Sequence, residues 1–348
     1  MSVNEYLIDA STRHQIMLQR LSGGSFNKLK PLLEKLQKDI RARLSENPTD
    51  FQMNRLTSLM RDIQSLFDAA NSEVSKQLNL DLEEFIPYET DFQYRMLGNA
   101  VTTELTLPAI EQVVAAVTTA KAELISGGVT KRLTISEMVE TLGTKPVTIE
   151  NKIRAGIIEG KSVDQMVRDI MRVANQAHKR DVRTIVRTAF NLAGSEARRA
   201  VNAANSDVLI GERLIVTLDS RTSVTCYGLS VKNIIYKIGE GPQPPLHFGC
   251  RTVRVGVVDP RYAVPGIKGL KSARGDNGVE KIDVDVTFDQ FLKNQSVAFQ
   301  KEFFYKFSGG HYKYDAWKAG KISGADFVDG NGAEIDLSYL KSLDSITL

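Results

Sequence analysis

Two stretches, 213-RLIVTLDSRTSVTC-226 and 245-PLHFGCRTVRVGVV-258, mark where a helical pattern gives way to β-rich sequence. Short runs of aliphatic and β-branched residues at 214–218, 234–238 and 253–258 are typical of strands, and Gly- and Pro-rich turn material separates the last two. The sequence therefore predicts a small three-stranded antiparallel sheet inserted into an otherwise helical chain.

The sequence before this insert has helical periodicity. Apolar residues recur at steps of three and four over 29–44 and again over 53–74, with a polar Pro-Thr turn between the two runs. This pattern predicts an antiparallel helix hairpin, which either packs within its own domain or serves as a docking arm for a larger partner. Residues 85–108 contain two prolines and are expected to be irregular or strand-like.

Helix start signals return further along the chain. Thr134 and Ser162 are each followed three residues later by Glu or Gln, which is the spacing of a capping box. The second of them opens a run to about residue 205 that predicts one long helix, and residues 178–181 are a point at which it could break.

The sequence after the insert is more mixed. Residues 259–285 are rich in Gly, Pro and charge and are expected to form an extended linker or loop, and a last helical segment is predicted from Thr287 to Gly309. The predicted fold class is mainly α with a small antiparallel β insert (α+β). The predicted regions are a helical N-terminal region with the hairpin (1–108), a motif-bearing module (109–258) and a linker with a helical C-terminal extension (259–348).

The composition excludes several classes of protein. The 348 residues are 42% apolar and 25% charged, which is ordinary for a globular protein and unlike a disordered one. Two cysteines exclude a disulfide-rich secreted scaffold. Residues 1–10 carry two acidic side chains and no basic region before an apolar run, so we expect no signal peptide.

Positive charge is concentrated in one segment. Residues 161–205 hold nine bases against four acids, an excess of five, whereas the net charge of the whole chain is only +3. Clustered Lys and Arg are what phosphate contacts require, although most charged runs are simply solvated helix faces. The candidate contacts for sequence-nonspecific DNA binding are Arg168, Arg172, Lys179, Arg180 and Arg183.

Both cysteines flank the same histidine. Cys226, His247 and Cys250 offer the thiolate and imidazole groups that zinc prefers, and Asp219 is the nearest candidate for a fourth ligand. Two other interpretations stay open at this stage: buried free thiols beside a hydrogen-bonded histidine, or a thiol nucleophile with His247 as base and Asp219 as orienting group. Arg221 is expected to pin this loop by bidentate bonding to a carboxylate or to carbonyls.

The order of these residues resembles a known family. Arg187 and Asn191 precede the pattern T-x-D-x-R-T…C…P-x-H-x-x-C-R, which is similar to that of the head morphogenesis family of tailed bacteriophages, the minor head proteins of the phage Mu and SPP1 types. The residues that carry the resemblance in this pattern are Thr217, Asp219, Arg221, Thr222, Cys226, Pro245, His247, Cys250 and Arg251.

The resemblance implies a capsid-associated, structural protein of low copy number and not an enzyme. Its implied partners are the phage portal protein and the major capsid or scaffold proteins, with genomic DNA as a further nonspecific partner and no membrane. The implied location is the virion, at the capsid interior or portal vertex, after assembly in the host cytoplasm. Thr252 stands where many relatives have cysteine, and Ser223 is no cysteine either, so these departures count against zinc.

Overall fold

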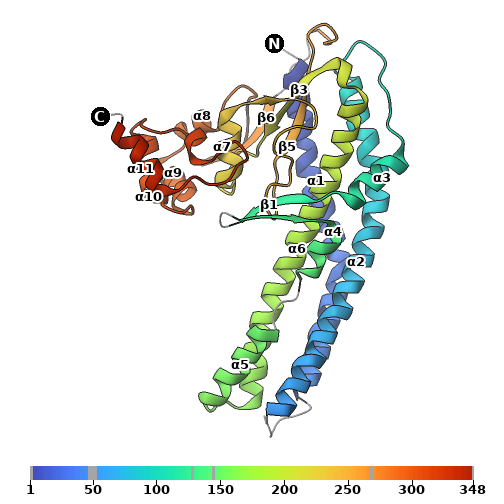
Figure 1. The fold of residues 1–348 in the computed structure, drawn as a ribbon, viewed down its shortest axis with the longest axis vertical. Coiled ribbons are helices and arrows are strands. Elements are labelled where there is room, and N and C mark those ends of the chain that lie inside the picture. The colour runs from blue at the N-terminus through green and yellow to red at the C-terminus, as the bar shows by residue number, and fades with distance from the viewer. Residues whose placement is uncertain (1–2, 46–52, 127–128, 143–145, 266–269, 347–348) are drawn as a thin grey trace. The chain divides into compact units, whose positions relative to one another are not determined.

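The computed structural model describes residues 3–45, 53–126, 129–142, 146–265 and 270–346. It is mainly helical with small antiparallel sheets (Figure 1), which confirms the predicted fold class. None of the helices within these ranges combines the length and the apolar character that crossing a membrane requires.

The first part of the chain is dominated by three long helices. Its elements are α1 (Val3–Ser45), α2 (Met53–Gly98), α3 (Ile110–Thr119), β1 (Ala122–Ser126), β2 (Val129–Leu133), α4 (Ile135–Glu140), α5 (Pro146–Ile158) and α6 (Val163–Ala204).

The rest of the chain consists of shorter elements. They are η1 (Ser206–Val208), β3 (Leu209–Ile215), α7 (Val224–Lys232), β4 (Ile235–Tyr236), β5 (Val253–Val258), β6 (Leu270–Gly275), β7 (Gly278–Asp283), α8 (Phe288–Lys293), α9 (Val297–Tyr305), α10 (Gly310–Lys318), η2 (Gly324–Phe327) and α11 (Leu337–Ile346).

The chain forms two compact units, and each is discontinuous in sequence. Unit 1 comprises Met1–Leu18, Ile86–Arg132 and Asn191–Leu348, and unit 2 comprises Gln19–Phe85 and Leu133–Phe190. Helices α1, α2 and α6 contribute residues to both units. The three regions predicted from the sequence are each continuous in the chain, whereas these two units are not. The units therefore do not test the predicted boundaries at 108 and 258, which stay predictions.

Unit 2 contains the predicted helix hairpin. Arg43 of α1 pairs with Asp62 of α2, and Lys28 pairs with Asp81, so the two helices run antiparallel. The apolar stripes meet in a core that also takes in α5 and α6: Leu36, Ile40, Leu59, Ile63, Phe67, Ile153 and Ile170. The Pro-Thr turn that the sequence places between the helices lies outside the described residues.

The expectation of irregular structure over 85–108 is wrong for its first half. Helix α2 continues through Pro87 to Gly98. Proline removes one backbone donor from a helix interior, but Ile86, Glu89 and Thr90 around it are all buried in tertiary contacts. Packing of this face therefore maintains the helix despite the local penalty.

The two capping signals are confirmed, whereas the break in the long helix is not. The Thr134 side chain accepts from the Glu137 amide at the start of α4, and the Ser162 side chain accepts from the Gln165 amide before α6. Helix α6 then runs without interruption to Ala204, across the suggested break at 178–181.

The predicted three-stranded sheet is present, in the order β4-β3-β5 with antiparallel pairing. Every residue of β5 is buried, and Val253 and Val255 pack in a core with residues of α1, α2 and α6. Leu214 of β3 packs in a second core, with α7 and the C-terminal helices. Between β3 and β4 the chain forms helix α7, which the sequence analysis did not predict.

Two predictions about the C-terminal part need correction. The expected linker contains an antiparallel hairpin, β6 and β7, whose turn includes Gly278 at a φ of +91°. The single helix expected after Thr287 is two helices, α8 and α9, because the chain turns at 294–296 and Ser296 caps a new start. These helices surround a core of aromatic side chains: Tyr227, Phe288, Phe303, Phe304, Trp317 and Phe327.

Candidate functional site

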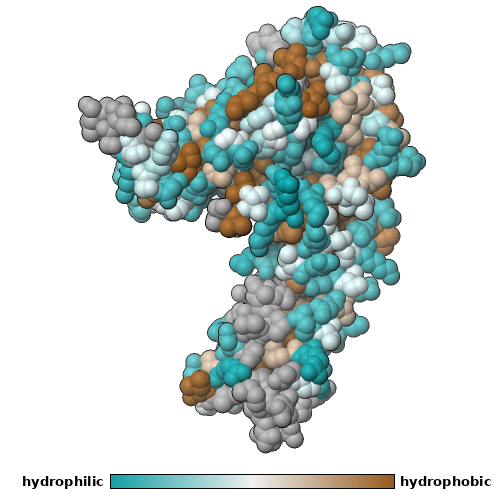
Figure 2. Space-filling view, in the orientation of Figure 1, coloured by the Kyte–Doolittle hydropathy of each residue, from teal (hydrophilic) through white to brown (hydrophobic). Residues whose placement is uncertain are grey.

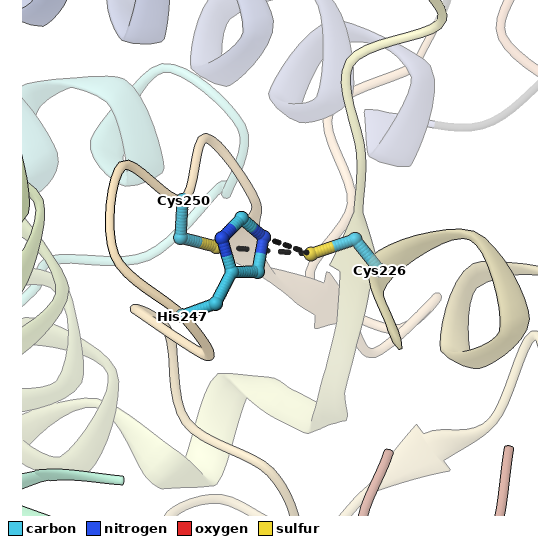
Figure 3. Close-up of side chains that lie close together, drawn as sticks. All are labelled: Cys226, His247 and Cys250. Carbon is cyan, nitrogen blue, oxygen red and sulfur yellow. Dashed lines mark hydrogen bonds between the residues drawn. The ribbon is translucent and has the colours of Figure 1, made fainter. Parts of the chain in front are cut away.

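The three candidate ligands come from two neighbouring segments of unit 1. Cys226 lies in the first turn of α7, where Ser223 caps the helix and accepts from the Cys226 amide at 3.2 Å. His247 and Cys250 lie on the loop that leads into β5 (Figure 3). The structure therefore brings together residues that are more than twenty positions apart in the chain.

The side chains of this cluster face one another closely. The Cys226 Sγ atom lies 3.3 Å from His247 Nε2 and 3.8 Å from Cys250 Sγ (Figure 3). On the other side of the ring, Nδ1 lies 3.0 Å from the carbonyl oxygen of Phe248. Because that oxygen can only accept, Nδ1 donates to it, and Nε2 is the nitrogen presented to the thiols.

The two cysteines are buried and are not joined by a disulfide. A hydrogen bond with Cys250, together with burial, raises the pKa of the Cys226 thiol well above its usual value. Burial also acts to raise the pKa of Cys250, but the hydrogen bond from Cys226 and the charge of His247 outweigh it and bring that pKa well below the usual value. Cys250 therefore has the thiolate character of the pair, and Cys226 retains the proton.

A motif residue on α6 holds the second segment in place. Asn191 donates from Nδ2 to the backbone carbonyl of Cys250 at 2.9 Å, and both residues are buried. This bond fixes the backbone of Cys250 against α6.

The fourth ligand suggested by the sequence, Asp219, lies outside the group of three ligands that can share one metal ion in the described chain. The Arg251 guanidinium binds both oxygens of its carboxylate, in one case at 2.7 Å. Burial acts to raise the pKa of this carboxyl, but the bonds and charge of Arg251 outweigh it, so the pKa lies below its usual value. The carboxylate is thus committed to an ion pair, and it does not orient His247, whose Nδ1 bonds to Phe248 instead.

The loop-pinning role expected of Arg221 belongs to Arg251. Arg221 reaches Asp219 with one guanidinium nitrogen at 3.3 Å and its side chain is 67% exposed, whereas the side chain of Arg251 is 15% exposed and bonds in bidentate fashion. The loop at 217–222 is closed by Thr222, whose hydroxyl donates to the carbonyl of Thr217. The remaining motif residue of this loop region, Pro245, is buried before β5.

A small cavity lies beside the cysteines. Its volume is about 30 Å³, room for one or two water molecules. Besides the cluster itself, its lining consists mainly of hydroxyl-bearing and basic residues: Thr217, Arg221, Thr222, Ser223, Gly249, Arg251 and Thr252.

Sequence reasoning missed one side chain that holds the loop beside this cavity. The Nζ atom of Lys306, in the C-terminal part, donates to the carbonyls of Ser220 and Thr222, the latter at 2.7 Å. Desolvation lowers the pKa of this lysine to about 8, although the charge of Asp219 opposes the shift. Nothing in the local sequence pairs these segments, because more than eighty residues separate them.

The basic candidates lie on α6 within unit 2. A rotation of about 100° per residue places Arg168, Arg172, Lys179 and Arg183 within about 60° of one another around the helix axis. We call these four residues the basic stripe. Its three arginines are exposed and Lys179 is half-buried. Arg180 lies to the side of the stripe, with its side chain 78% exposed.

Among the described residues, neighbouring side chains neutralise only part of the positive charge of the basic stripe. Arg172 lies 3.6 Å from Asp169, and the Arg183 guanidinium lies 4.6 Å from the centre of the Phe26 ring. In Figure 2 the coloured side chains along the middle of α6 are mostly hydrophilic. Arg187, the motif residue that follows, is exposed on the same helix and has an interaction partner of its own.

The arrangement as a whole offers three soft ligand atoms within 4.8 Å of one another, next to a cavity of water size. The arrangement of His247 as base with Asp219 as its orienting group is not formed, because Nδ1 of His247 bonds to the Phe248 carbonyl. Comparisons of the chain with protein-family models, with curated proteins and with solved structures find no match.

Proposed function

We propose that this chain is a minor head protein of a tailed bacteriophage, a structural component that acts in head morphogenesis, genome packaging or ejection. The observation that supports the proposal is the convergence of its motif. Four of its residues, Asn191, Asp219, Cys250 and Arg251, form a group that we call the node: Asn191 donates to the Cys250 carbonyl, and Arg251 holds Asp219. Residues far apart in the motif are therefore linked through these two contacts.

The chemistry of this node favours a structural role over catalysis. The Asp219 carboxylate is paired with Arg251, the cysteines beside it are buried, and the adjoining cavity has a volume of only about 30 Å³. Such a node stabilises the packing of α6, α7 and β5, because buried polar groups with satisfied partners specify one arrangement of the elements that carry them. We therefore propose no enzymatic activity.

The proposed partners are the portal protein and the major capsid or scaffold proteins, and the proposed location is the capsid interior or portal vertex. The test uses virions and procapsids of the phage or prophage that encodes the chain. We expect mass spectrometry to detect the chain in the particles, and electron cryomicroscopy to place its density at the portal vertex. Absence of the chain from both kinds of particle would refute the proposal.

A variant pair connects this test to the motif. Arg251→Met should remove the chain from particles because the node no longer holds its loop. Arg221→Ala, which changes the exposed partner of the same carboxylate, should leave incorporation unchanged. If particles contain as much of the Arg251→Met variant as of the unchanged chain, the motif is not required for incorporation.

The basic stripe supports a second candidate function, nonspecific contact with genomic DNA during packaging or ejection. Three exposed arginines on one helix face can each contact a phosphate and release counterions. Reversal of Arg168, Arg172 and Arg183 to Glu should abolish DNA binding at low salt, measured by fluorescence anisotropy. Arg261→Glu, which changes an arginine with a 75% exposed side chain elsewhere, is the matched control. DNA affinity that does not depend on salt would contradict this function.

A further inference from the structure

The side chains of Cys226, His247 and Cys250 bring two sulfur atoms and one ring nitrogen within 4.8 Å of one another. We propose that these three side chains bind one zinc ion, with the fourth coordination position directed to the small cavity beside them and filled by water. This inference is independent of the proposed phage function, since it concerns the chemistry of the cluster alone.

The distances within the cluster match a tetrahedral site. With Zn–S near 2.3 Å and Zn–N near 2.0–2.1 Å, a tetrahedron has edges of about 3.8 Å between two sulfurs and about 3.6 Å between sulfur and nitrogen. The observed Cys226–Cys250 and Cys226–His247 distances are 3.8 Å and 3.3 Å. All three ligand atoms lie within 4.8 Å of one another, so they could hold one ion between them.

The surroundings orient the ligands as metal sites do. His247 donates from Nδ1 to a backbone carbonyl, which fixes the tautomer that turns the lone pair of Nε2 toward the sulfurs. Cys226 lies in the first turn of α7, where the Ser223 side chain accepts from its backbone amide and fixes its position. The backbone of Cys250 is held by Asn191.

Charge balance favours a divalent ion at this buried position. Two thiolates and a neutral imidazole around Zn²⁺ form a site with no net charge, and the set of two sulfurs and one nitrogen is soft enough to select zinc over magnesium or calcium. The Asp219 carboxylate is already neutralised by Arg251, so it does not compete for the ion.

The fourth position is the feature that distinguishes this site from a closed structural one. The other residues that line the cavity, among them Ser223, Thr252 and Arg251, offer no further thiol or imidazole. A volume of about 30 Å³ holds the water that completes the tetrahedron. An ion at this place joins the start of α7 to the loop before β5, so its binding contributes to folding.

The test measures metal on the full chain, purified under reducing conditions with zinc in the medium. We expect about one zinc per chain by elemental analysis, and replacement by Co²⁺ should produce thiolate charge-transfer absorption with the visible bands of a tetrahedral ion. Cys226→Ser and Cys250→Ser should each lose the bound metal. His311→Ala, which changes an exposed histidine outside the cluster, should retain it.

A gain-of-ligand variant keeps the test valid if the serine variants fail to fold. Thr252→Cys places a third thiol at the cavity, so the charge-transfer intensity of the Co²⁺ form should rise by about half, as two thiolates become three. The proposal is overturned if the unchanged chain carries less than about a tenth of a zinc and shows no thiolate charge-transfer with Co²⁺. A cluster that only forms a Cys226–Cys250 disulfide on exposure to air, without binding metal when reduced, overturns it equally.

Discussion

The node around Asp219 and the basic stripe of α6 use the same side chain, arginine, under opposite conditions. In the node, the Arg251 side chain is 15% exposed and binds a carboxylate that is almost entirely buried. In the stripe, the Arg172 side chain is 73% exposed and faces Asp169 at 3.6 Å. A buried charge depends on its partner for its solvation, whereas an exposed charge depends mainly on water. The node should therefore determine stability and the stripe should determine binding.

The largest expected effect is that of replacing Arg251. Arg251→Met leaves the Asp219 carboxylate buried without its main partner, so the free energy of unfolding should fall by about 3–5 kcal/mol. Urea denaturation followed by circular dichroism measures this change. Arg221→Ala removes only the exposed partner of the same carboxylate and should cost about 1 kcal/mol or less. If the two variants lose the same amount of stability, the difference in burial does not determine how much each arginine contributes to the free energy of unfolding.

A smaller effect is expected at the other end of the node. Asn191→Ala removes the donor to the Cys250 carbonyl, and an unsatisfied buried carbonyl costs about 1–3 kcal/mol. The same denaturation experiment measures it. Its matched control is Asn99→Ala, which removes an exposed amide just after the C-terminal end of α2 that bonds to Tyr6 at 3.3 Å. The comparison fails if the control loses as much stability as Asn191→Ala.

Acid should weaken the node through Asp219. Its pKa is depressed in the folded chain, so the ion pair contributes stability above the pKa of the unfolded state and loses that contribution as pH falls toward the folded value. We expect the decline to begin below about pH 5. Asp219→Asn cannot titrate, so the difference in unfolding free energy between it and the unchanged chain should shrink with acid. A difference that stays constant from about pH 7 to about pH 3 would contradict this role.

The smallest effect on stability is expected for the stripe. Reversal of Arg168 and Arg172 to Glu should change the free energy of unfolding by less than about 0.5 kcal/mol, as for most surface substitutions. The salt dependence of DNA binding should change instead, and its slope should fall by about 0.9 for each phosphate that the chain no longer neutralises. A large drop in stability with unchanged DNA binding would make the stripe structural, like the node.

Local signals in the sequence predicted most of the secondary structure. Capping side chains such as Thr134 and Ser162 act on backbone amides three residues away, so their effect can be read from spacing alone. The β-branched runs of β3 and β5 are equally local. Periodicity also predicted the helix hairpin, because residues three and four apart share one face of a helix.

The errors arose where tertiary packing overrides local preference. Helix α7 contains β-branched residues and Gly228, a weak helix sequence, yet its Tyr227 is buried among aromatic rings of the C-terminal helices. Gly228 is required there, since a Cβ at this position would lie 2.5 Å from a methyl group of Val328. Helix α2 likewise continues through Pro87 because both sides of the proline are buried.

The sequence by itself determined the type of most elements, the charge of α6 and the grouping of two cysteines around one histidine, because each depends on residues close together in the chain. Only the tertiary structure decided that Arg251 and not Arg221 holds Asp219, that Asp219 stays out of the cluster, and that Asn191 supports Cys250. These choices depend on which of several chemically similar groups is buried at the right distance. That distance is set by the packing of α6, α7 and β5.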